Sequence, residues 1–223
     1  MTTHALKRTV VRQFAHPTGF LGRLAGWVMA NRPSNRQRNT WAVEQLDLRP
    51  RDRVLEVGSG PGLALQMIAA RLSGGGLVGI DHSSAMLAQA KRRNRAAVAE
   101  GKVRLLHTSV EELVADAAGS HGPFDKILAV NVAMFWQNCD ETIAGLASLL
   151  RPGGILAVLH QPRVAPVTSE AARQAASQFE ESMARASLGP VDVRELTTLS
   201  PIAVCVLGTK PPNSDEPVKG ATR

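Results

Sequence analysis

The stretch VLEVGSGPGLAL, from Val54 to Leu65, decides the fold of this chain. A short apolar run leads into three closely spaced glycines, Gly58, Gly60 and Gly62, and a run with helical spacing follows them. A strand that enters a glycine-rich turn and then a helix is how α/β proteins present a nucleotide-like ligand to a helix N-terminus. The stretch therefore predicts an α/β fold with a ligand at this turn.

Short β-type runs and helical stretches alternate from Val54 onward. Strands that are nearly all apolar and are separated by helices indicate a parallel sheet covered on both faces. One of the intervening stretches, 83–100, predicts a continuous helix. The five β-type runs are 53–58, 77–81, 103–108, 126–131 and 155–160.

The pattern changes after residue 161. Residues 167–189 predict a helix with Ser169 as a candidate N-cap, and two β-type runs, 191–200 and 201–210, follow it. Their short connection at Ser200-Pro201 makes them antiparallel, since a parallel pair would need a crossover. We therefore expect a Rossmann-like, doubly wound, seven-stranded sheet that is mostly parallel and has an antiparallel last strand.

The chain divides into three parts by pattern. Basic amphipathic helices predict an N-terminal helical lid over residues 1–48, followed by an α/β domain at 49–210. The polar, proline-bearing segment 211–223 is predicted to be a disordered tail. Residues 1–53 contain ten Lys or Arg and three Asp or Glu, whereas the remainder contains sixteen of each sign. This basic segment is either a patch for an acidic substrate, nucleic acid or anionic lipid, or a solvated helical face.

Composition narrows the function classes. No apolar run approaches the roughly 20 residues of a membrane span, and no signal core follows the first basic residues, so we expect a cytoplasmic protein. Cys139 and Cys205 are too few for a disulfide framework, lack metal-ligand companions and are predicted to be buried thiols. No metal site is expected. The chain has no Tyr and no aromatic stacking platform for bases, which argues against nucleic-acid binding.

The spacing of the turn separates two classes of cofactor. A dinucleotide site requires G-x-G-x-x-G, whose third glycine would fall at Leu63, but the glycine comes one residue early, at Gly62. This disfavours a nicotinamide-dependent oxidoreductase. The pattern is instead E-x-G-x-G-x-G, with Glu56 inside the strand. Asp81 ends the next strand, where a carboxylate can accept hydrogen bonds from ribose hydroxyls.

Four motifs carry a resemblance to a known family. VLEVGSGPG, VGIDHS, FDKILAVN and LLRPGGILAVLH, in this order, resemble the successive motifs of the class I S-adenosylmethionine-dependent methyltransferases. The resemblance covers about residues 40 to 210. It implies S-adenosylmethionine as the cofactor and methyl transfer by direct displacement as the reaction.

The resemblance also implies the cofactor-binding residues. Glu56 would orient the turn or reach the methionine ammonium, Asp81 would hold the ribose, and His82 would lie at the adenine edge. Ser109 and Val110 stand where the family often carries Asp-Ala next to the adenine, so this contact departs from the usual pattern. The complete expected set is Glu56, Gly58, Ser59, Gly60, Gly62, Asp81, His82, Ser109, Val110 and Asn131.

Two residues are candidates for catalysis. His160 ends an apolar run, and its reference pKa of about 6.5 suits a general base, although a hydrogen-bonded histidine that caps a strand is the alternative. Asn131 occupies a position where amine-methylating members carry Asn or Asp, but NVAMFW lacks their Pro-Pro-aromatic continuation. Phe135 and Trp136 either line an acceptor pocket or pack in the core. His107, inside a β-type run, is predicted to be a core residue.

Five residues precede the sheet directly: Arg32, Asn35, Arg38, Asn39 and Trp41. They either meet the cofactor carboxylate or an acidic acceptor, as Arg does well, or are solvated. We therefore predict a methyltransferase that acts on a small-molecule acceptor. The alternatives are an RNA or protein methyltransferase and a non-catalytic S-adenosylmethionine-binding protein. The sequence leaves the acceptor and the oligomeric state open, a homodimer included.

Overall fold

A computed structural model describes residues 33–116, 122–163 and 165–212. Residues 1–32 of the predicted N-terminal helical lid and residues 213–223 of the predicted tail lie outside these ranges. The strands are β1 (Arg53–Val57), β2 (Gly76–Asp81), β3 (Val103–His107), β4 (Phe124–Val130), β5 (Leu150–His160), β6 (Val191–Leu196) and β7 (Ala203–Thr209). The helices are α3 (Pro33–Glu44), α4 (Leu63–Ala69), α5 (Ser84–Arg93), α6 (Arg95–Ala99), α7 (Val110–Ala115), α8 (Cys139–Ser148) and α9 (Ser169–Arg185), and a 3-10 turn η1 (Ala133–Phe135) follows β4.

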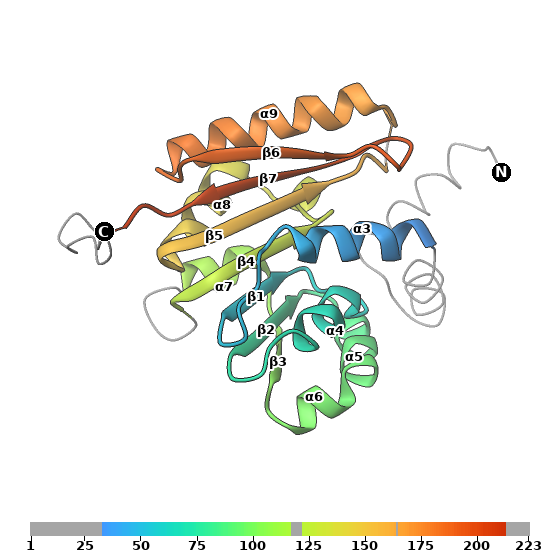
Figure 1. The fold of residues 1–223 in the computed structure, drawn as a ribbon, viewed down its shortest axis with the longest axis vertical. Coiled ribbons are helices and arrows are strands. Elements are labelled where there is room, and N and C mark those ends of the chain that lie inside the picture. The colour runs from blue at the N-terminus through green and yellow to red at the C-terminus, as the bar shows by residue number, and fades with distance from the viewer. Residues whose placement is uncertain (1–32, 117–121, 164, 213–223) are drawn as a thin grey trace, which may run out of the picture.

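The seven strands form one sheet in the order β3-β2-β1-β4-β5-β7-β6 (Figure 1). The pairs from β3 to β5 are parallel, whereas β7 runs antiparallel to both β5 and β6. The predicted Rossmann-like sheet with its antiparallel last strand is confirmed. From β1 the chain adds β2 and β3 on one side of the sheet and then β4 and β5 on the other. Open α/β sheets bind their ligands at such a switch point, beyond the carboxyl ends of the two strands that flank it, here β1 and β4.

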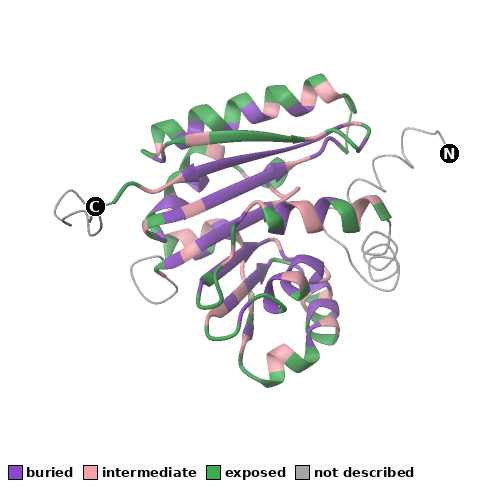
Figure 2. Ribbon diagram, in the orientation of Figure 1, coloured by how far each residue is buried: buried purple, intermediate pink, exposed green. Residues whose placement is uncertain are grey.

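The central strands β1, β4 and β7 and the second half of β5 are buried on both faces, which explains their nearly continuous apolar runs, whereas the edge strand β6 is mostly exposed (Figure 2). Alternate residues of β5 belong to the two hydrophobic cores. Leu156 and Val158 pack in the core beneath α7, α8 and α9. Ala157 and Leu159 pack in the core beneath α3, α4 and α5. Each face of β5 thus supports a different set of helices.

The predicted helix over 83–100 is interrupted at Asn94, between α5 and α6. The Asn94 amide donates hydrogen bonds to the carbonyl oxygens of Gly62 and Ala90, at 3.0 and 2.9 Å. An asparagine side chain that bonds nearby carbonyl groups competes with helix continuation. The break therefore fastens the end of α5 to the glycine turn.

The N-cap predicted at Ser169 is wrong by one residue. The Thr168 hydroxyl accepts the capping hydrogen bond from the Ala171 N–H at 3.1 Å. Ser169 instead accepts the Ile202 N–H at 3.3 Å and links the start of α9 to the segment before β7. Within the described ranges, the helices are too short or too polar to cross a membrane.

Candidate functional site

The turn after β1 contains three glycines with positive φ: Gly58 at 65°, Gly60 at 51° and Gly62 at 77°. A Cβ at Gly58 would lie 2.4 Å from a Val132 methyl group, and one at Gly62 would lie 2.6 Å from the Asn94 amide nitrogen. At Gly60, no described atom lies within 4 Å of that position. Gly58 and Gly62 therefore serve packing within the protein, whereas Gly60 leaves room for a ligand.

Two buried polar side chains lie at this turn: Glu56 in β1 and Ser59 between the first two glycines. Glu56 and Ser59 are 3% and 5% exposed, and the Leu65 N–H donates a hydrogen bond to the Glu56 carboxylate. Glu56 Oε2 and the Ser59 hydroxyl have no hydrogen-bond partner within the described residues. Burial, together with the nearby charge of Asp81, raises the pKa of Glu56 to about 8. An ammonium group at the turn would satisfy Oε2 and favour the ionised carboxylate.

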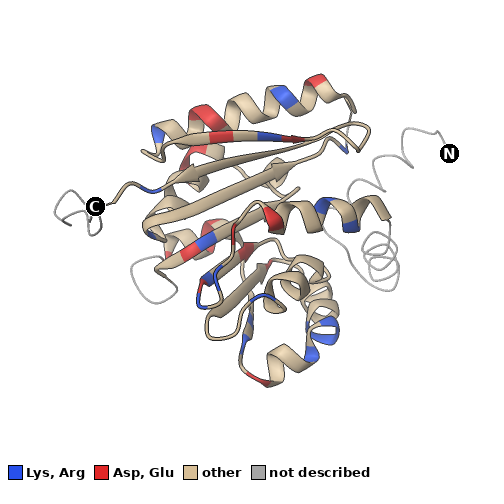
Figure 3. Cartoon of the chain, viewed as in Figure 1, with Lys and Arg blue, Asp and Glu red and all other residues tan. Residues whose placement is uncertain are grey.

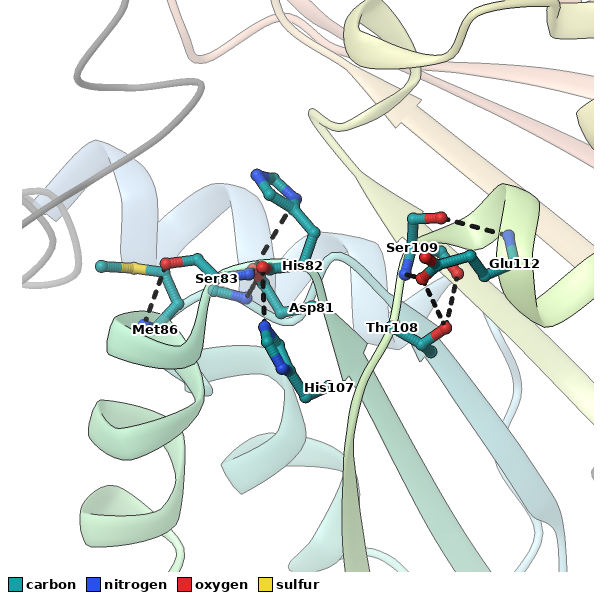
Figure 4. A network of polar contacts seen from close by, with 9 residues as sticks. Asp81, His82, Ser83, Met86, His107, Thr108, Ser109 and Glu112 are labelled. Carbon is teal, nitrogen blue, oxygen red and sulfur yellow. Dashed lines mark hydrogen bonds and ion pairs between the residues drawn. The ribbon is translucent and has the colours of Figure 1, made fainter.

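Asp81 is held rigidly at the end of β2 (Figure 4). Its Oδ2 accepts the Gly60 N–H and its Oδ1 accepts the Ser83 N–H, both at 2.8 Å. Each carboxylate oxygen keeps further lone pairs for a ligand. Two backbone N–H groups thus fix the carboxylate beside the open face of Gly60.

Ser109 begins α7 in a capping box with Glu112. The Glu112 N–H donates to the Ser109 hydroxyl oxygen at 3.1 Å, and the Ser109 N–H donates to the Glu112 carboxylate at 2.8 Å. The Thr108 hydroxyl donates to the same carboxylate at 3.1 Å (Figure 4). These hydrogen bonds hold the pKa of Glu112 below its usual value. Val110 is buried as the first residue of the helix.

His107 is exposed, so its predicted place in the core is wrong. Its ring Nε2 lies 3.0 Å from the His82 carbonyl oxygen and donates to it (Figure 4). As the last residue of β3, it points away from the sheet and joins the loops that follow β2 and β3. The His82 ring is exposed, and its Nδ1 lies 3.9 Å from Asp81.

Asn131 joins the carboxyl ends of β4 and β5. Its side-chain oxygen accepts the Gln161 N–H at 2.7 Å, and its amide donates to the Gln161 carbonyl at 3.2 Å. The residue adopts a positive φ of 56°, which Asn tolerates better than most residues. These two hydrogen bonds engage the Asn131 side chain with the backbone of Gln161.

Gln161 is a buried residue that sequence reasoning missed. Its side-chain oxygen accepts hydrogen bonds from Arg38 at 3.0 Å and Arg163 at 3.3 Å, and its amide donates to the Pro201 carbonyl at 2.8 Å. The available signal was its place directly after His160, where a polar residue follows a buried strand. Gln161 thereby connects α3, the end of β5 and the segment before β7.

The structure describes four of the five residues that the sequence analysis placed directly before the sheet. Arg38 and Asn39 are 6% and 7% exposed, so the solvated alternative is wrong for both. Asn35 is partly buried and accepts hydrogen bonds from both side chains. Trp41 packs against the core on the α3 face, and Arg32 lies outside the described residues.

His160 contributes to a pocket of about 430 Å³ between α8 and α9. Its Nδ1 is buried and lacks a partner in the described part of the chain, and its ring meets Phe179 edge-on at 6.2 Å. Burial lowers the pKa of His160, which keeps the ring neutral and able to accept a proton. The wall also includes Ala133, Met134, Cys139 and Ser182.

The structure also shows where the two cysteines and the two aromatic residues after Asn131 lie. Cys139 is only half-buried at the pocket, which corrects its prediction as a buried thiol, whereas Cys205 is fully buried. Trp136 packs against the core, and Phe135 is 47% exposed. Neither aromatic residue belongs to the pocket wall. Across the described ranges, no group of three or more His, Cys, Asp or Glu residues is arranged to hold a metal ion.

Comparisons with known proteins agree with this geometry. A family model described as a methyltransferase domain matches residues 55–156. The uncharacterized methyltransferase YdaC of Bacillus subtilis is 32% identical over 188 residues, which cover 84% of this chain and 98% of that protein. A trans-aconitate 2-methyltransferase of Paracidovorax citrulli is 31% identical over 117 residues, 52% of this chain and 41% of that protein.

A solved structure supports the fold independently. The N-methyltransferase NodS from Bradyrhizobium japonicum, in complex with S-adenosylhomocysteine, has a TM-score of 0.66 at 16% identity. The match covers 83% of this chain and 91% of that chain. The two chains therefore share the sheet and its helical layers.

Proposed function

This chain belongs to the S-adenosylmethionine-dependent methyltransferase family, and we propose that it methylates a small-molecule acceptor. The observation that carries the proposal is the pocket of about 430 Å³ with His160 on its wall, at the carboxyl end of β5. A pocket of this size fits a small ligand. Open α/β sheets bind their ligands at this edge.

The residues around the glycine turn fit S-adenosylmethionine. Asp81 would accept the ribose hydroxyls, while the unpartnered oxygens of Glu56 and Ser59 would receive the methionine ammonium. His82 and the first turn of α7, with Ser109 and Val110, would border the adenine. The cofactor supplies a methyl group that its sulfonium centre has already activated.

The protein must still align the acceptor atom, the methyl group and the sulfur. For an acceptor that must lose a proton, it must also supply a general base. Alignment of the reacting groups can lower a barrier by roughly 7–11 kcal/mol. His160 would take the proton of an acceptor hydroxyl or acidic carbon, because burial keeps its ring neutral. Asn131 would act by positioning, since it fixes the backbone that directly follows His160.

The curated relatives favour a small acceptor. Trans-aconitate 2-methyltransferases, by their name, act on a small organic acid, and one matches 52% of this chain. The pocket wall combines apolar residues with His160, Cys139 and Ser182 and with the charged side chains of Asp140, Glu181 and Arg185, which suits a compact, polar molecule. RNA or protein as the acceptor is the alternative that the assay below must separate.

The test is calorimetric titration with S-adenosylmethionine, S-adenosylhomocysteine and NADH, followed by turnover assays with small acids, alcohols, RNA and protein. We expect both adenosyl ligands to bind and NADH not to bind. Asp81→Asn should weaken S-adenosylhomocysteine by about 10- to 100-fold, since hydrogen bonds to a charged group are worth roughly 1.5–3 kcal/mol. Glu100→Gln, which removes an exposed carboxylate beyond α6, is the matched control.

Turnover decides the acceptor. Methylation of a small molecule that slows by 100-fold or more in His160→Gln, with cofactor affinity unchanged, would support the proposal. Methylation of RNA or protein alone would refute the small-molecule assignment. Equal turnover by His160→Gln and the unsubstituted enzyme would remove His160 from catalysis.

A further inference from the structure

Arg38 is a buried cation without a described anionic partner. It is 6% exposed, and its guanidinium donates to two neutral amide oxygens, those of Gln161 and Asn35. Its Nε is buried and has no hydrogen-bond partner within the described residues. No salt bridge to Arg38 occurs in the same ranges. A buried charge of this kind is costly unless an opposite charge meets it.

A second guanidinium increases the positive potential at this position. Arg163 donates to the same Gln161 oxygen as Arg38, so two cations share one neutral acceptor. Burial and the charge of Arg163 lower the pKa of Arg38 to about 9, which still leaves it protonated at neutral pH. Figure 3 shows the charged residues along the chain; the acidic residue of α3, Glu44, is the last residue of that helix and follows Arg38 by more than one turn.

The position lies at the carboxyl end of β5, one residue after His160. Gln161 directly follows β5, and β4 separates β5 from β1 and its glycine turn. At about 4.8 Å per strand, the end of β5 lies roughly 10 Å from that turn. Asn131 and the Pro201 carbonyl fix Gln161 in place. The guanidinium of Arg38 is therefore held on a fixed residue at the edge of the sheet where open α/β folds bind their ligands.

We propose that Arg38, assisted by Arg163, binds a carboxylate of the methyl acceptor, so that the acceptor is a small organic acid. The proposal rests on the methyltransferase function proposed above. A guanidinium matches a carboxylate through paired N–H donors, and such charge-assisted hydrogen bonds are about twice as strong as neutral ones. The methionine carboxylate of the cofactor is the other source of the same chemistry, and the experiment separates the two.

The probes are formate and succinate, compared with chloride at equal ionic strength, on protein saturated with S-adenosylhomocysteine. The saturating ligand fills the place of the methionine carboxylate, so a further carboxylate effect reports the acceptor. We expect formate or succinate to raise the Tm by about 2–5 °C at ten times its Kd. Arg38→Gln should abolish the rise and keep the affinity for S-adenosylhomocysteine within about threefold. Arg36→Gln, an exposed position on the same helix, should keep the rise.

Two outcomes would overturn the proposal. If Arg38→Gln weakens S-adenosylhomocysteine more than tenfold but leaves 5′-methylthioadenosine unchanged, Arg38 binds the cofactor carboxylate. If the unsubstituted protein shows no carboxylate effect, no such subsite exists. Arg38→Lys, which keeps the charge but loses the paired donors, guards against misfolding and should retain less than half of the rise. Failure of the unsubstituted protein to bind S-adenosylhomocysteine would instead refute the cofactor assignment.

Discussion

Replacement of Glu56 by Gln should change how cofactor binding depends on pH. Burial, with the charge of Asp81, raises the pKa of Glu56 to about 8, so the carboxyl group is mostly protonated in the free protein at pH 6. The methionine ammonium, whose own pKa is about 8, would favour the ionised form. Binding must then release one proton from Glu56. Affinity should therefore increase about tenfold per pH unit between roughly pH 5.5 and 7.

The assay is calorimetry with S-adenosylhomocysteine at several pH values, in buffers of different ionisation enthalpy. The unsubstituted protein should release about one proton on binding at pH 6, and Glu56→Gln should release none and lose the pH slope. The ligand 5′-methylthioadenosine, which lacks the amino-acid portion, should bind both proteins without this slope. The same slope in Glu56→Gln, or the same slope with 5′-methylthioadenosine, would refute the ammonium contact.

The same group affects stability in a defined window. The pKa of Glu56 is higher in the folded state than its ordinary value of 4.5, so the folded state binds more protons between about pH 4.5 and 8. The contribution of Glu56 to stability is therefore complete below pH 4.5 and is lost as pH rises toward 8. The loss is at most about 4–5 kcal/mol. Urea unfolding should show a smaller decrease over this window for Glu56→Gln.

Three further predictions concern the turn, a helix cap and the candidate base. Gly62→Ala should destabilise the fold by about 2–5 kcal/mol in urea unfolding, because it adds a close contact to an unfavourable φ. Gly153→Ala, at a similar φ of 74° with no described atom in the way, should cost only about 1–2 kcal/mol, and equal costs would exclude the packing explanation. Ser109→Ala should cost about 1 kcal/mol through loss of the capping box, and an unchanged unfolding midpoint would contradict this. The kcat/KM profile should fall on the acidic side below pH 6.5, because burial lowers the pKa of His160; persistence of this limb in His160→Gln would assign it to another group.

The fold was predictable because its signals are local. Apolar runs of strand length, helical spacing between them and the glycine turn all lie within short windows of sequence, and together they predict the parallel sheet. The short connection at Ser200-Pro201 was enough to predict the antiparallel last pair. One error came from a contact that is not local: Asn94 interrupts the predicted helix, and its side-chain amide donates to the carbonyl oxygen of the distant Gly62.

The site was predictable only in part. Asp81 and Glu56 could be proposed because each belongs to a motif with fixed spacing. The different roles of Gly58, Gly60 and Gly62 could not be predicted, since they depend on which atoms approach each α-carbon from other elements.

The sequence by itself therefore determined the order of strands and helices along the chain and the class of cofactor. Only the tertiary structure decided that His160 faces a pocket and that His107 is exposed. It also decided that Arg38, 123 positions before Gln161, is buried against it. The physical reason is that burial and hydrogen-bond partners arise from contacts between distant segments, and these contacts set the charge and pKa on which binding and catalysis depend.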